Sequence, residues 1–333
     1  MLRGMRMYKN KKVLITGGTG FLGKAVVDVL SSKGYKKLLP IGSSLDLTCG
    51  KKTFDFFQET RPDAVIHLAA TVGGIGANKD NPGLFMYNNL AMGINTIEAA
   101  RLNKVKKFIM VGTVCAYPKF TPVPFKEEDI WNGYPEETNA PYGIAKKSLM
   151  QLVQSYNKQY GFNGVNLIPV NMYGPRDNFD PAISHVIPAL ILKFHKAMRE
   201  AKDSHGFYKK RRPVEIWGTG KASREFLYVD DCAEAICLSL EKDVSAEPIN
   251  IGTGGEIMIE HLAHAIAEIM GYKGKIKFNP KYPDGQPRRC LDISRAKQEL
   301  GYSSTTGLYE GLEKTIKWFN INAEEFDDYL NRI

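Results

Sequence analysis

The chain of 333 residues is long enough to bury one large core or two modest ones. Hydrophobic residues make up 43% of it and charged residues 24%, which is typical of a soluble globular protein. No apolar run approaches the roughly 20 residues of a membrane helix, so we expect no contact with a membrane. Met1–Asn10 is basic but lacks the apolar segment of a signal peptide. The five cysteines are scattered, without a CxxC pair, which indicates reduced thiols and a cytoplasmic location.

The net charge of +9 is most simply explained by a solvated basic surface, and the run Lys209–Arg212 is interpreted as a polar loop of that kind. A positive field also attracts polyanions. Because the chain has no zinc-finger spacing, RNP-like motif or basic zipper, we expect neither nucleic acid nor a metal ion as a ligand. Nucleotide diphosphates and a dinucleotide would use the same field.

The first motif in chain order is a glycine-rich turn between an apolar strand and a helix. The strand is Lys12–Thr16, and Gly17, Gly20 and Gly23 follow it at the spacing G-x2-G-x2-G. Glycines at such a turn let the backbone approach a pyrophosphate, which lies on the helix N-terminus. A glycine-rich turn without a ligand is the alternative, but the strand–turn–helix context favours a dinucleotide site.

The second predicted strand, Lys37–Ile41, precedes the position where the adenosine ribose is selected. An acidic residue there selects NAD, and an arginine selects a 2′-phosphate. The chain has Ser43 and Ser44 instead, which give neither signal. Asp46 and Leu47 are within reach of the adenine in this pattern, although Asp46 fits a turn equally well.

Near-continuous apolar runs, of the kind found in buried parallel strands, alternate with helical patterns through the first half of the chain. The predicted strands are Asp63–Ala70, Lys107–Gly112 and Val165–Val170, and the predicted helices are Asn81–Arg101 and Tyr142–Tyr160. This alternation predicts an α/β fold with a parallel, doubly wound sheet. His67, inside the first of these strands, is interpreted as a core histidine.

The pattern changes after Tyr173–Pro175, where strands become sparse. The later predicted elements are the helices Val186–Lys196 and Ile259–Met270 and the short strands Val214–Trp217, Glu225–Tyr228, Pro248–Gly252 and Lys275–Phe278. Of these, Pro248–Gly252 is expected to return to the first sheet. We therefore predict a Rossmann-type dinucleotide-binding domain over 1–175, to which 225–258 returns, and a smaller α+β domain over 176–333 that mainly binds substrate.

A proton-transfer pair is predicted at the start of the helix Tyr142–Tyr160. Tyr142 and Lys146 lie four residues apart and therefore share one helical face. An ammonium buried beside a phenol favours the phenolate and lowers the pKa of the tyrosine, which can then exchange a proton with a carbonyl near neutral pH. Tyr-x3-Lys is common by chance, so the pair gains its weight from the motifs around it.

Motifs spread over nearly the whole chain point to one enzyme family. They are Thr16–Gly23, His67–Ala70 with Val72–Ile75, Cys115–Pro118, Tyr142–Lys146, Asn171–Phe179, Ser184–Pro188, Trp217–Gly220 with Arg224–Phe226, and Asp284–Arg289. With them the chain resembles the extended short-chain dehydrogenase/reductases of the nucleotide-sugar type. Within that family it is most similar to the GDP-L-fucose synthases, which are GDP-4-keto-6-deoxymannose 3,5-epimerase/4-reductases. The glycine loop and Tyr-x3-Lys mark only the superfamily, whereas the segments around Val72, Cys115 and His185 are more specific.

The resemblance implies catalytic roles for five residues. Thr113 would hydrogen-bond the C4 carbonyl of the sugar, Tyr142 would donate a proton to it, and Lys146 would hold the nicotinamide ribose and lower the pKa of Tyr142. Cys115 and His185 would form the epimerisation pair. A C4 ketone acidifies the protons at C3 and C5, so a thiolate on one face can remove a proton and an imidazole on the other can return one. Found alone, such a cysteine or histidine is more often structural.

The resemblance also implies the binding residues. The cofactor would contact Gly17, Thr19, Gly20, Phe21, Leu22, Gly23, Ser43, Ser44, Asp46, Leu47, Leu68, Ala69, Ala70, Tyr142, Lys146, Pro169, Asn171, Met172 and His185. The GDP-sugar would contact Asn171, Lys193, Trp217, Arg224 and Arg289, of which the two arginines suit a diphosphate. NADP is expected by analogy, with NAD as the alternative. The helices Asn81–Arg101 and Tyr142–Tyr160 are the pair that forms the homodimer interface in similar enzymes.

Two departures from the family pattern leave the substrate and the cofactor open. Thr113 is followed by Val114, where the family often has a second hydroxyl, and the arginine for a 2′-phosphate is absent after the second strand. A 4-keto reductase or epimerase acting on another GDP-linked deoxy sugar or a heptose is therefore the alternative enzyme. A dinucleotide sensor on the same scaffold is the non-enzymatic alternative, against which the intact Thr113, Tyr142 and Lys146 argue.

Overall fold

The computed structural model describes residues 8–73, 80–200, 213–282 and 284–332. The expectations for the start of Met1–Asn10, for Gly74 and Ile75 and for Lys209–Arg212 lie outside the described residues. Within the described ranges, no helix is both long and apolar enough to cross a membrane.

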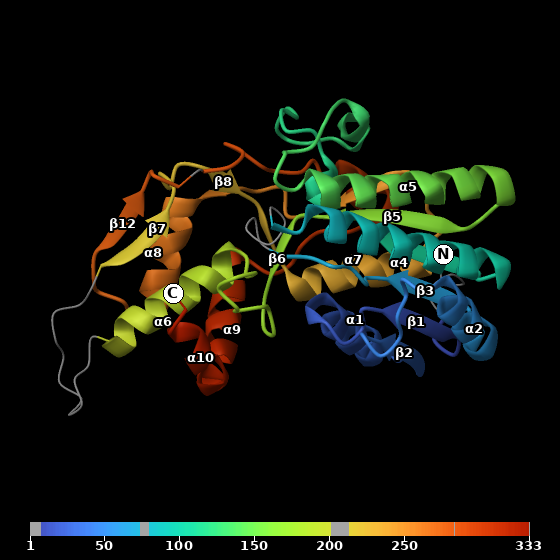
Figure 1. Ribbon diagram of the computed structural model, residues 1–333, viewed down its shortest axis with the longest axis horizontal. Coiled ribbons are helices and arrows are strands. Elements are labelled where there is room, and N and C mark those ends of the chain that lie inside the picture. Colours follow the sequence, from blue (N-terminus) through green and yellow to red (C-terminus); the bar gives the residue numbers. More distant parts are fainter. Residues whose placement is uncertain (1–7, 74–79, 201–212, 283, 333) are drawn as a thin grey trace.

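A parallel sheet of six strands forms the centre of the larger part of the molecule (Figure 1). In the order β10-β5-β4-β3-β1-β2, its strands are β10 (Pro248–Ile251), β5 (Gly164–Pro169), β4 (Lys107–Val111), β3 (Ala64–His67), β1 (Lys12–Thr16) and β2 (Lys37–Ile41). The chain runs outward from β1 to β2 and then crosses to β3 on the other side of β1, so the order reverses between β1 and β3. The predicted doubly wound α/β fold is confirmed, and ligands of such sheets bind at the carboxyl ends of the strands beside this reversal.

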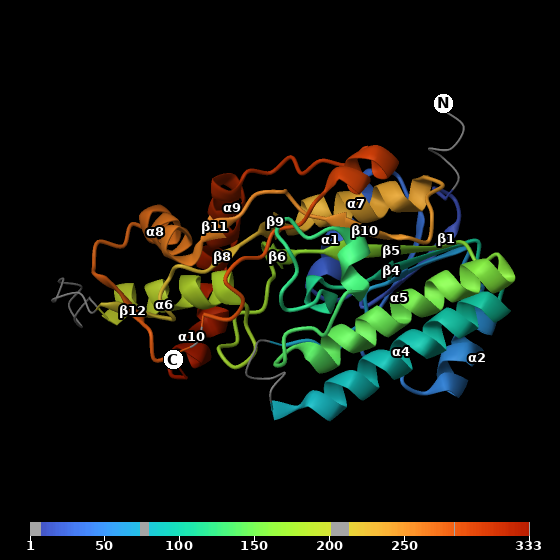
Figure 2. The same ribbon diagram turned by 90° about the horizontal axis from the view of Figure 1, so that it is seen from above.

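Helices cover both faces of the sheet, because consecutive parallel strands need crossover connections. On one face α1 (Phe21–Ser32) packs against α7 (Val229–Glu241). On the other face α4 (Pro82–Leu102) packs against α5 (Ala140–Tyr160), with α2 (Gly50–Thr60) next to α4 (Figure 2). Every residue of β3 and β4 is buried as a result, which explains why these strands read as continuous apolar runs.

A second, smaller group of elements lies beyond the sheet, on the left of Figure 1. It contains α6 (Val186–Glu200), α8 (Ile259–Ile269), α9 (Leu308–Ile321), α10 (Asp327–Leu330) and the strand pairs β7 (Val214–Trp217) with β12 (Ile276–Asn279) and β8 (Ser223–Arg224) with β11 (Ile257–Met258). The buried side chains of this group form their own hydrophobic cluster. The parallel pair β6 (Asn171–Tyr173) and β9 (Phe226–Tyr228) joins the two groups, since β6 continues from β5 and β9 leads into α7.

The chain returns to the first core twice after β9. Strand β10 pairs with β5, as expected for Pro248–Gly252. A second return was not predicted: Leu291 and the π-helical turn η3 (Ala296–Leu300) also pack into the core of the six-stranded sheet. The segment between β12 and η3 therefore runs from the smaller group back to the sheet, past the carboxyl ends of the strands.

Several predicted strands are shorter in the structure. The strand expected over Asp63–Ala70 ends at His67, because the amide of Ala69 turns to the side-chain oxygen of Thr16, 3.3 Å away. The helix expected over Val186–Lys196, by contrast, continues to Glu200.

The strand expected over Glu225–Tyr228 begins only at Phe226. Glu225 is fully buried and turns inward, where its carboxylate accepts hydrogen bonds from the amides of Gly254 (2.8 Å) and Leu291 (2.7 Å). A buried carboxylate needs such donors, so Glu225 serves as a connection between segments rather than as a strand residue.

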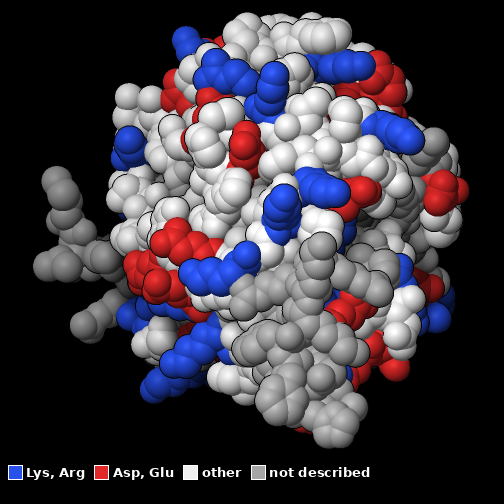
Figure 3. Space-filling view, turned by 90° about the vertical axis from the view of Figure 1, so that its left-hand side faces the viewer, with Lys and Arg blue, Asp and Glu red and all other residues white. Residues whose placement is uncertain are grey.

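Charged side chains of both signs are interspersed on the face of the molecule shown in Figure 3, which is the end formed by the smaller group. Ion pairs such as Lys314 with Glu310 (2.7 Å) lie in this group. Among the residues described on this face, positive side chains are thus accompanied by negative ones.

Candidate active site

The glycine-rich turn has the close packing that a dinucleotide site requires. Gly17 has a φ of +69°, and a Cβ there would lie 2.8 Å from the amide nitrogen of Ala69. A Cβ on Gly23 would lie 2.1 Å from the carbonyl oxygen of Gly17. Gly20 is open by comparison, and as the N-cap of α1 it provides no side-chain hydrogen bond to the first amides of the helix. No side chain at the N-cap bonds the first amides of α1, and the glycines keep Cβ atoms out of the turn, so the turn fits a pyrophosphate.

Other predicted cofactor residues lie next to this turn or at the ends of neighbouring elements. Leu68 and Ala69 follow β3, where the Leu68 amide donates to the carbonyl oxygen of Thr16 (3.0 Å). Thr19 lies against the end of β2, since a Cβ on Gly42 would be 2.2 Å from its hydroxyl oxygen. The others at strand or helix ends are Phe21 and Leu22 in α1, Ala70 after β3, Pro169 in β5 and Met172 in β6.

The segment after β2 contains the predicted adenosine residues. Ser43 and Ser44 are exposed, whereas the side chain of Leu47 is buried. The carboxylate of Asp46 accepts hydrogen bonds from the hydroxyl (2.6 Å) and the amide (3.0 Å) of Thr48, and these bonds lower its pKa. Asp46 is therefore engaged in a local turn, and the two serines are the hydroxyls open to a ligand.

Four of the five predicted catalytic residues, Thr113, Cys115, Tyr142 and Lys146, meet at the carboxyl end of β4. Among the described residues, no hydrogen bond joins His185 to these four. Thr113 caps the short turn η1 (Val114–Ala116), because its hydroxyl accepts a hydrogen bond from the amide of Cys115 (3.2 Å). Helix α5 packs closely on this turn: a Cβ on Gly143 would lie 2.3 Å from the carbonyl oxygen of Cys115. Tyr142, next to this glycine, shares a hydrogen bond with the Thr113 side chain and interacts electrostatically with Cys115.

The proton affinities of Tyr142 and Lys146 differ from the expectation. Burial and then the nearby Cys115 raise the pKa of Tyr142 well above its ordinary value, and only the hydrogen bond with Thr113 opposes this. Burial lowers the pKa of Lys146 to about 8, and its ammonium donates to the carbonyl oxygen of Val111 (3.1 Å). The expected lowering of the Tyr142 pKa by Lys146 is wrong for this structure, because desolvation outweighs any effect of the ammonium.

Two arginines lie near Cys115, Arg224 in β8 and Arg289 on the segment between β12 and η3. The guanidinium of Arg289 lies 3.9 Å from the sulfur of Cys115. Burial and the charge of Arg289 lower the pKa of Arg224 to about 10, while Asp284 and Cys115 act in the opposite direction. His185, at the start of α6, is open to solvent, yet the surrounding protein and the charge of Arg289 lower its pKa. Cys115, His185 and both arginines thus share one electrostatic neighbourhood.

The other predicted substrate residues lie in β6, β7 and α6. The ring of Trp217 is exposed and stacks on Tyr282, with centroids 4.4 Å apart and planes at 11°. The ammonium of Lys193 lies 5.1 Å from the centre of the Trp217 ring and donates to the carbonyl oxygen of Glu215. Asn171 donates its side-chain amide to the carbonyl oxygen of Glu225 (3.1 Å), which ties β6 to the start of β9.

The sequence analysis did not identify three residues that contact the predicted substrate residues or their neighbours. Tyr282 stacks on Trp217, and the Asp284 carboxylate binds the amide of Thr219 (2.7 Å). Gln286 is buried and accepts hydrogen bonds from Arg289. The motif Asp284–Arg289 was the signal that could have indicated the last two, since it contains both a glycine turn and an arginine pair.

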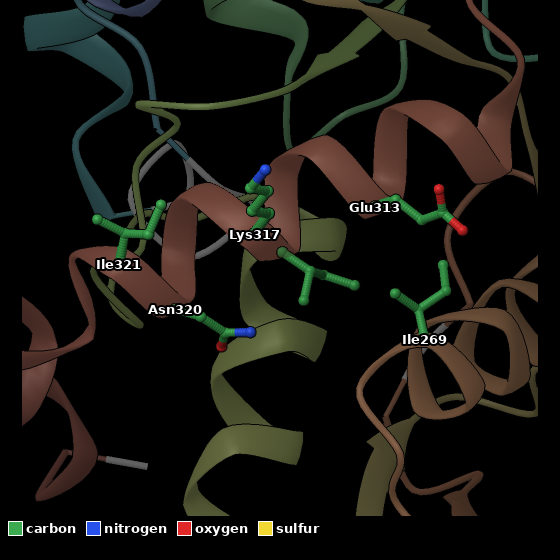
Figure 4. Close-up of a pocket in the computed structure, with 6 residues that line it drawn as sticks. Ile269, Glu313, Lys317, Asn320 and Ile321 are labelled. Atoms are coloured by element: carbon green, nitrogen blue, oxygen red, sulfur yellow. The ribbon is translucent and has the colours of Figure 1, made fainter.

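Two other features do not belong to the site. His67 is fully buried and bonds through its Nδ1 to the hydroxyl of Thr16 (2.8 Å), so its interpretation as a core histidine is confirmed. A shallow hollow between α8 and α9 is lined by Ile269, Glu313, Ile316, Lys317, Asn320 and Ile321 (Figure 4). None of the predicted site residues lines this hollow.

Comparison with known proteins agrees with this arrangement. The model of the NAD dependent epimerase/dehydratase family matches residues 13–252. The chain is 40% identical to a GDP-L-fucose synthase of Escherichia coli (strain K12) over 326 residues, which covers 95% of this chain and 98% of that protein.

Two solved structures extend the comparison. The chain is similar to a GDP-6-OMe-4-keto-L-xylo-heptose reductase from C. jejuni, with a TM-score of 0.86 and 32% identity over 95% of this chain and 99% of the other. It is also similar to a GDP-L-fucose synthetase from Naegleria fowleri bound to NADP, with a TM-score of 0.85 and 28% identity over 95% and 96% of the two chains. The chain therefore belongs to the NAD-dependent epimerase/dehydratase family.

Proposed function

We propose that the protein epimerises C3 and C5 of GDP-4-keto-6-deoxy-D-mannose and then reduces C4 with NADPH, which gives GDP-L-fucose. The observation that carries the proposal is the convergence of Thr113, Cys115 and Tyr142 at the end of β4, with Arg289 beside the thiol. The relative from Escherichia coli, which is named a GDP-L-fucose synthase, is 40% identical over nearly the full length.

Epimerisation needs two groups that move protons at carbon and a group that stabilises the enolate. Cys115 removes the proton from C3 or C5, and His185 returns one from the opposite face, which inverts the centre. The hydroxyls of Thr113 and Tyr142, which share a hydrogen bond, hold the C4 oxygen and stabilise its negative charge. The positive charges of Arg224 and Arg289 bind the diphosphate of the substrate.

Reduction uses the same hold on the C4 oxygen. Because burial raises the pKa of Tyr142, this residue keeps its proton at neutral pH and is suited to donate it to the C4 oxygen. Lys146 holds the nicotinamide ribose. When bound, the reduced nicotinamide cofactor supplies the hydride for C4. One site can therefore epimerise first and reduce afterwards.

The proposed cofactor is NADP, with NAD as the weaker alternative. The close glycine packing from Gly17 to Gly23 supports a pyrophosphate at the turn, and Lys146 and Tyr142 are the proposed contacts of the nicotinamide ribose. The exposed Ser43 and Ser44 offer hydroxyls, without an arginine, to a 2′-phosphate. The Naegleria fowleri relative was solved with NADP bound.

A second candidate is a 4-keto reductase or epimerase of another GDP-linked deoxy sugar or a heptose. Val114 favours it: its side chain is only 4% exposed and packs into the core of the sheet, so it leaves a single hydroxyl, that of Thr113, in this turn for the sugar. The similar C. jejuni structure is named a heptose reductase. We also propose that the protein is a cytoplasmic homodimer whose interface is formed by α4 and α5.

Product analysis tests the proposal directly. The protein is incubated with GDP-4-keto-6-deoxymannose and either NADPH or NADH in D2O, and the product is identified by NMR. We expect GDP-L-fucose with deuterium at C3 and C5, and a higher kcat/KM for NADPH. Formation of a D-configured product without deuterium would show a plain 4-keto reductase, and no turnover of this sugar would favour a different GDP-sugar.

A further inference from the structure

A buried amide lies directly behind the arginine that faces Cys115. Gln286 is 6% exposed, and its Nε2 donates to the carbonyl oxygen of Lys119 at 2.7 Å. Its Oε1 accepts from Nε of Arg289 at 3.0 Å and from Nη2 of Arg289 at 2.7 Å. Both ends of the amide are thus used, and the carbonyl of Lys119 decides which end carries the oxygen.

This contact fixes the direction of the guanidinium. The group is planar, so holding its Nε/Nη2 edge also determines where Nη1 lies. Nη1 of Arg289 lies 3.9 Å from the sulfur of Cys115. Gln286 therefore connects the loop after Cys115, through Lys119, to the cation that faces the thiol.

The backbone of this segment is held independently of the Gln286 side chain. The amide of Ser223 donates to the carbonyl oxygen of Pro287 (2.9 Å), and the amide of Glu225 donates to that of Arg289 (3.0 Å). On the other side, the amide of Phe125 donates to the carbonyl oxygen of Cys290 (2.8 Å). A change of the Gln286 side chain therefore acts on the direction and charge of Arg289 rather than on the path of the chain.

The partner of Arg289 is neutral, which matters for the charge that reaches the sulfur. The adjacent Arg288 instead pairs with the carboxylate of Glu256 through its Nε at 2.9 Å. In the described part of the chain, no carboxylate forms a salt bridge with Arg289, so its positive charge is not offset by a partner. Among the described residues, Arg224 and Tyr142 also act on Cys115, and His185 interacts electrostatically with Arg289.

We propose that Gln286 is a positioning residue, which aims the guanidinium of Arg289 at the sulfur of Cys115 and leaves its charge free to stabilise the thiolate. A thiolate is the form of cysteine that removes a proton from carbon, and a nearby arginine favours it. The inference deepens the proposed function, since the thiolate is the base of the proposed epimerisation. The effect of Gln286 on the Cys115 thiolate is expected in the free protein as well, without any sugar bound.

The experiment measures the thiolate of Cys115 in the full-length protein without substrate. Alkylation by iodoacetamide is followed from pH 6 to pH 10, and peptide mass spectrometry reports each cysteine separately. In Gln286→Glu the new carboxylate pairs with Arg289, so we expect the midpoint for Cys115 to rise by about one pH unit, which means about tenfold slower alkylation at neutral pH. Arg289→Gln, which removes the cation, should raise the midpoint in the same direction.

The controls separate this effect from a general change. Cys49, a partly buried free thiol elsewhere in the chain, is the internal reference in every sample. Gln298→Glu makes the same substitution at an exposed position of η3, and it should leave the Cys115 midpoint unchanged. If Gln286→Glu does not fold, Gln286→Leu takes its place, again with a raised midpoint expected because Arg289 is no longer held.

An unchanged Cys115 midpoint in a folded Gln286 variant would overturn the proposal. This result does not depend on the reaction that the protein performs. If wild-type protein fails to exchange deuterium into the keto-sugar while the Gln286 variants still shift the midpoint, the proposed function is wrong and the positioning role stands. If wild-type protein exchanges deuterium normally and the Cys115 midpoint does not shift in the Gln286 variants, the proposed function stands and the positioning role of Gln286 is wrong.

Discussion

Tyr142 holds its proton in this fold because burial raises its pKa, an effect that the sequence spacing alone could not predict. Tyr142→Phe preserves the ring but removes the donor, so reduction should fall by about 10²–10⁴-fold. The measurement is NADPH oxidation in the presence of the keto-sugar. Tyr160→Phe, at the exposed end of the same helix, is the matched control and should retain the wild-type rate. A rate near wild type for Tyr142→Phe would contradict its assignment as the proton donor.

Cys115 and His185 are assigned to C3 and C5, whereas Tyr142 is assigned to C4. Cys115→Ser should block deuterium exchange at C3 and C5, while reduction persists on the unepimerised sugar and gives a D-configured product. His185→Asn should change exchange and product stereochemistry together, because reprotonation is impaired. Product NMR after reaction in D2O distinguishes these results, with Cys49→Ser as the control thiol. GDP-L-fucose at normal rates with normal deuterium content from both variants would make the pair structural.

His67 makes the stability of the folded protein depend on pH in the acidic range. Burial, and then the charge of Lys146, lower its pKa from 6.5 to about 3, so the folded protein keeps the ring neutral where the unfolded chain protonates it. This contribution to stability is present above pH 6.5 and is lost as the pH falls toward 3. Between pH 7 and pH 5 the loss is about 2 kcal/mol.

Urea unfolding at pH 7 and pH 5 tests this account. His67→Asn is destabilised at both pH values but should lose about 2 kcal/mol less than wild type on acidification. His261→Asn, an exposed histidine on α8, should lose as much as wild type. Equal losses in wild type and His67→Asn would show that another group is responsible.

At the scale of elements, the strands and helices of the sheet could be predicted because periodicity records burial on both faces. Where the structure differs from the predicted elements, contacts between distant segments are the reason. Glu225 lies in an apolar stretch typical of a strand, but its buried carboxylate binds amides from two distant segments. Gln286 and Tyr282 act through partners far away in the chain, which no local pattern reveals. The candidate site was found from motifs, whereas the residues that position it were not.

The turn between β1 and α1 offers a test of the dinucleotide site as an element. A Cβ on Gly23 would lie 2.1 Å from the carbonyl oxygen of Gly17, so Gly23→Ala must push the turn apart. We expect a loss of about 1–3 kcal/mol in stability and much weaker NADPH binding by calorimetry. Gly83→Ala, where nothing lies within 4 Å of the new Cβ, should change neither. Wild-type NADPH affinity in Gly23→Ala would argue against a pyrophosphate at this turn.

At the scale of the molecule, the predicted site residues come from both groups of elements and from the segments between them. Cys115 and Tyr142 belong to the larger group, whereas Arg289 lies on the segment that returns from the smaller group to the first core. The second return, through η3, was hidden from the sequence because its short apolar pattern has no period of its own. The division at residue 176 remains a prediction, but the contacts across it explain why neither group alone would form the site.

The outer face of α4 and α5 is the surface on which the proposed homodimer depends. These two helices lie side by side along one edge of the molecule (Figure 2). The large apolar side chains exposed on them are Leu84, Tyr87, Ile94, Leu102 and Tyr160. Such a gathering of exposed apolar groups is typical of an interface, and a two-fold axis would pair the two helices with their copies in a four-helix bundle.

We expect a homodimer by light scattering at micromolar concentration. Ile94 is 46% exposed in the middle of α4, so Ile94→Glu should place a charge in the interface and give a monomer. Ile321→Glu is the matched control, since Ile321 is 74% exposed at the end of α9, away from this face, and the variant should stay dimeric. A monomeric wild-type protein would refute the interface. A dimer that survives Ile94→Glu but dissociates with Ile321→Glu would move the interface to the smaller group.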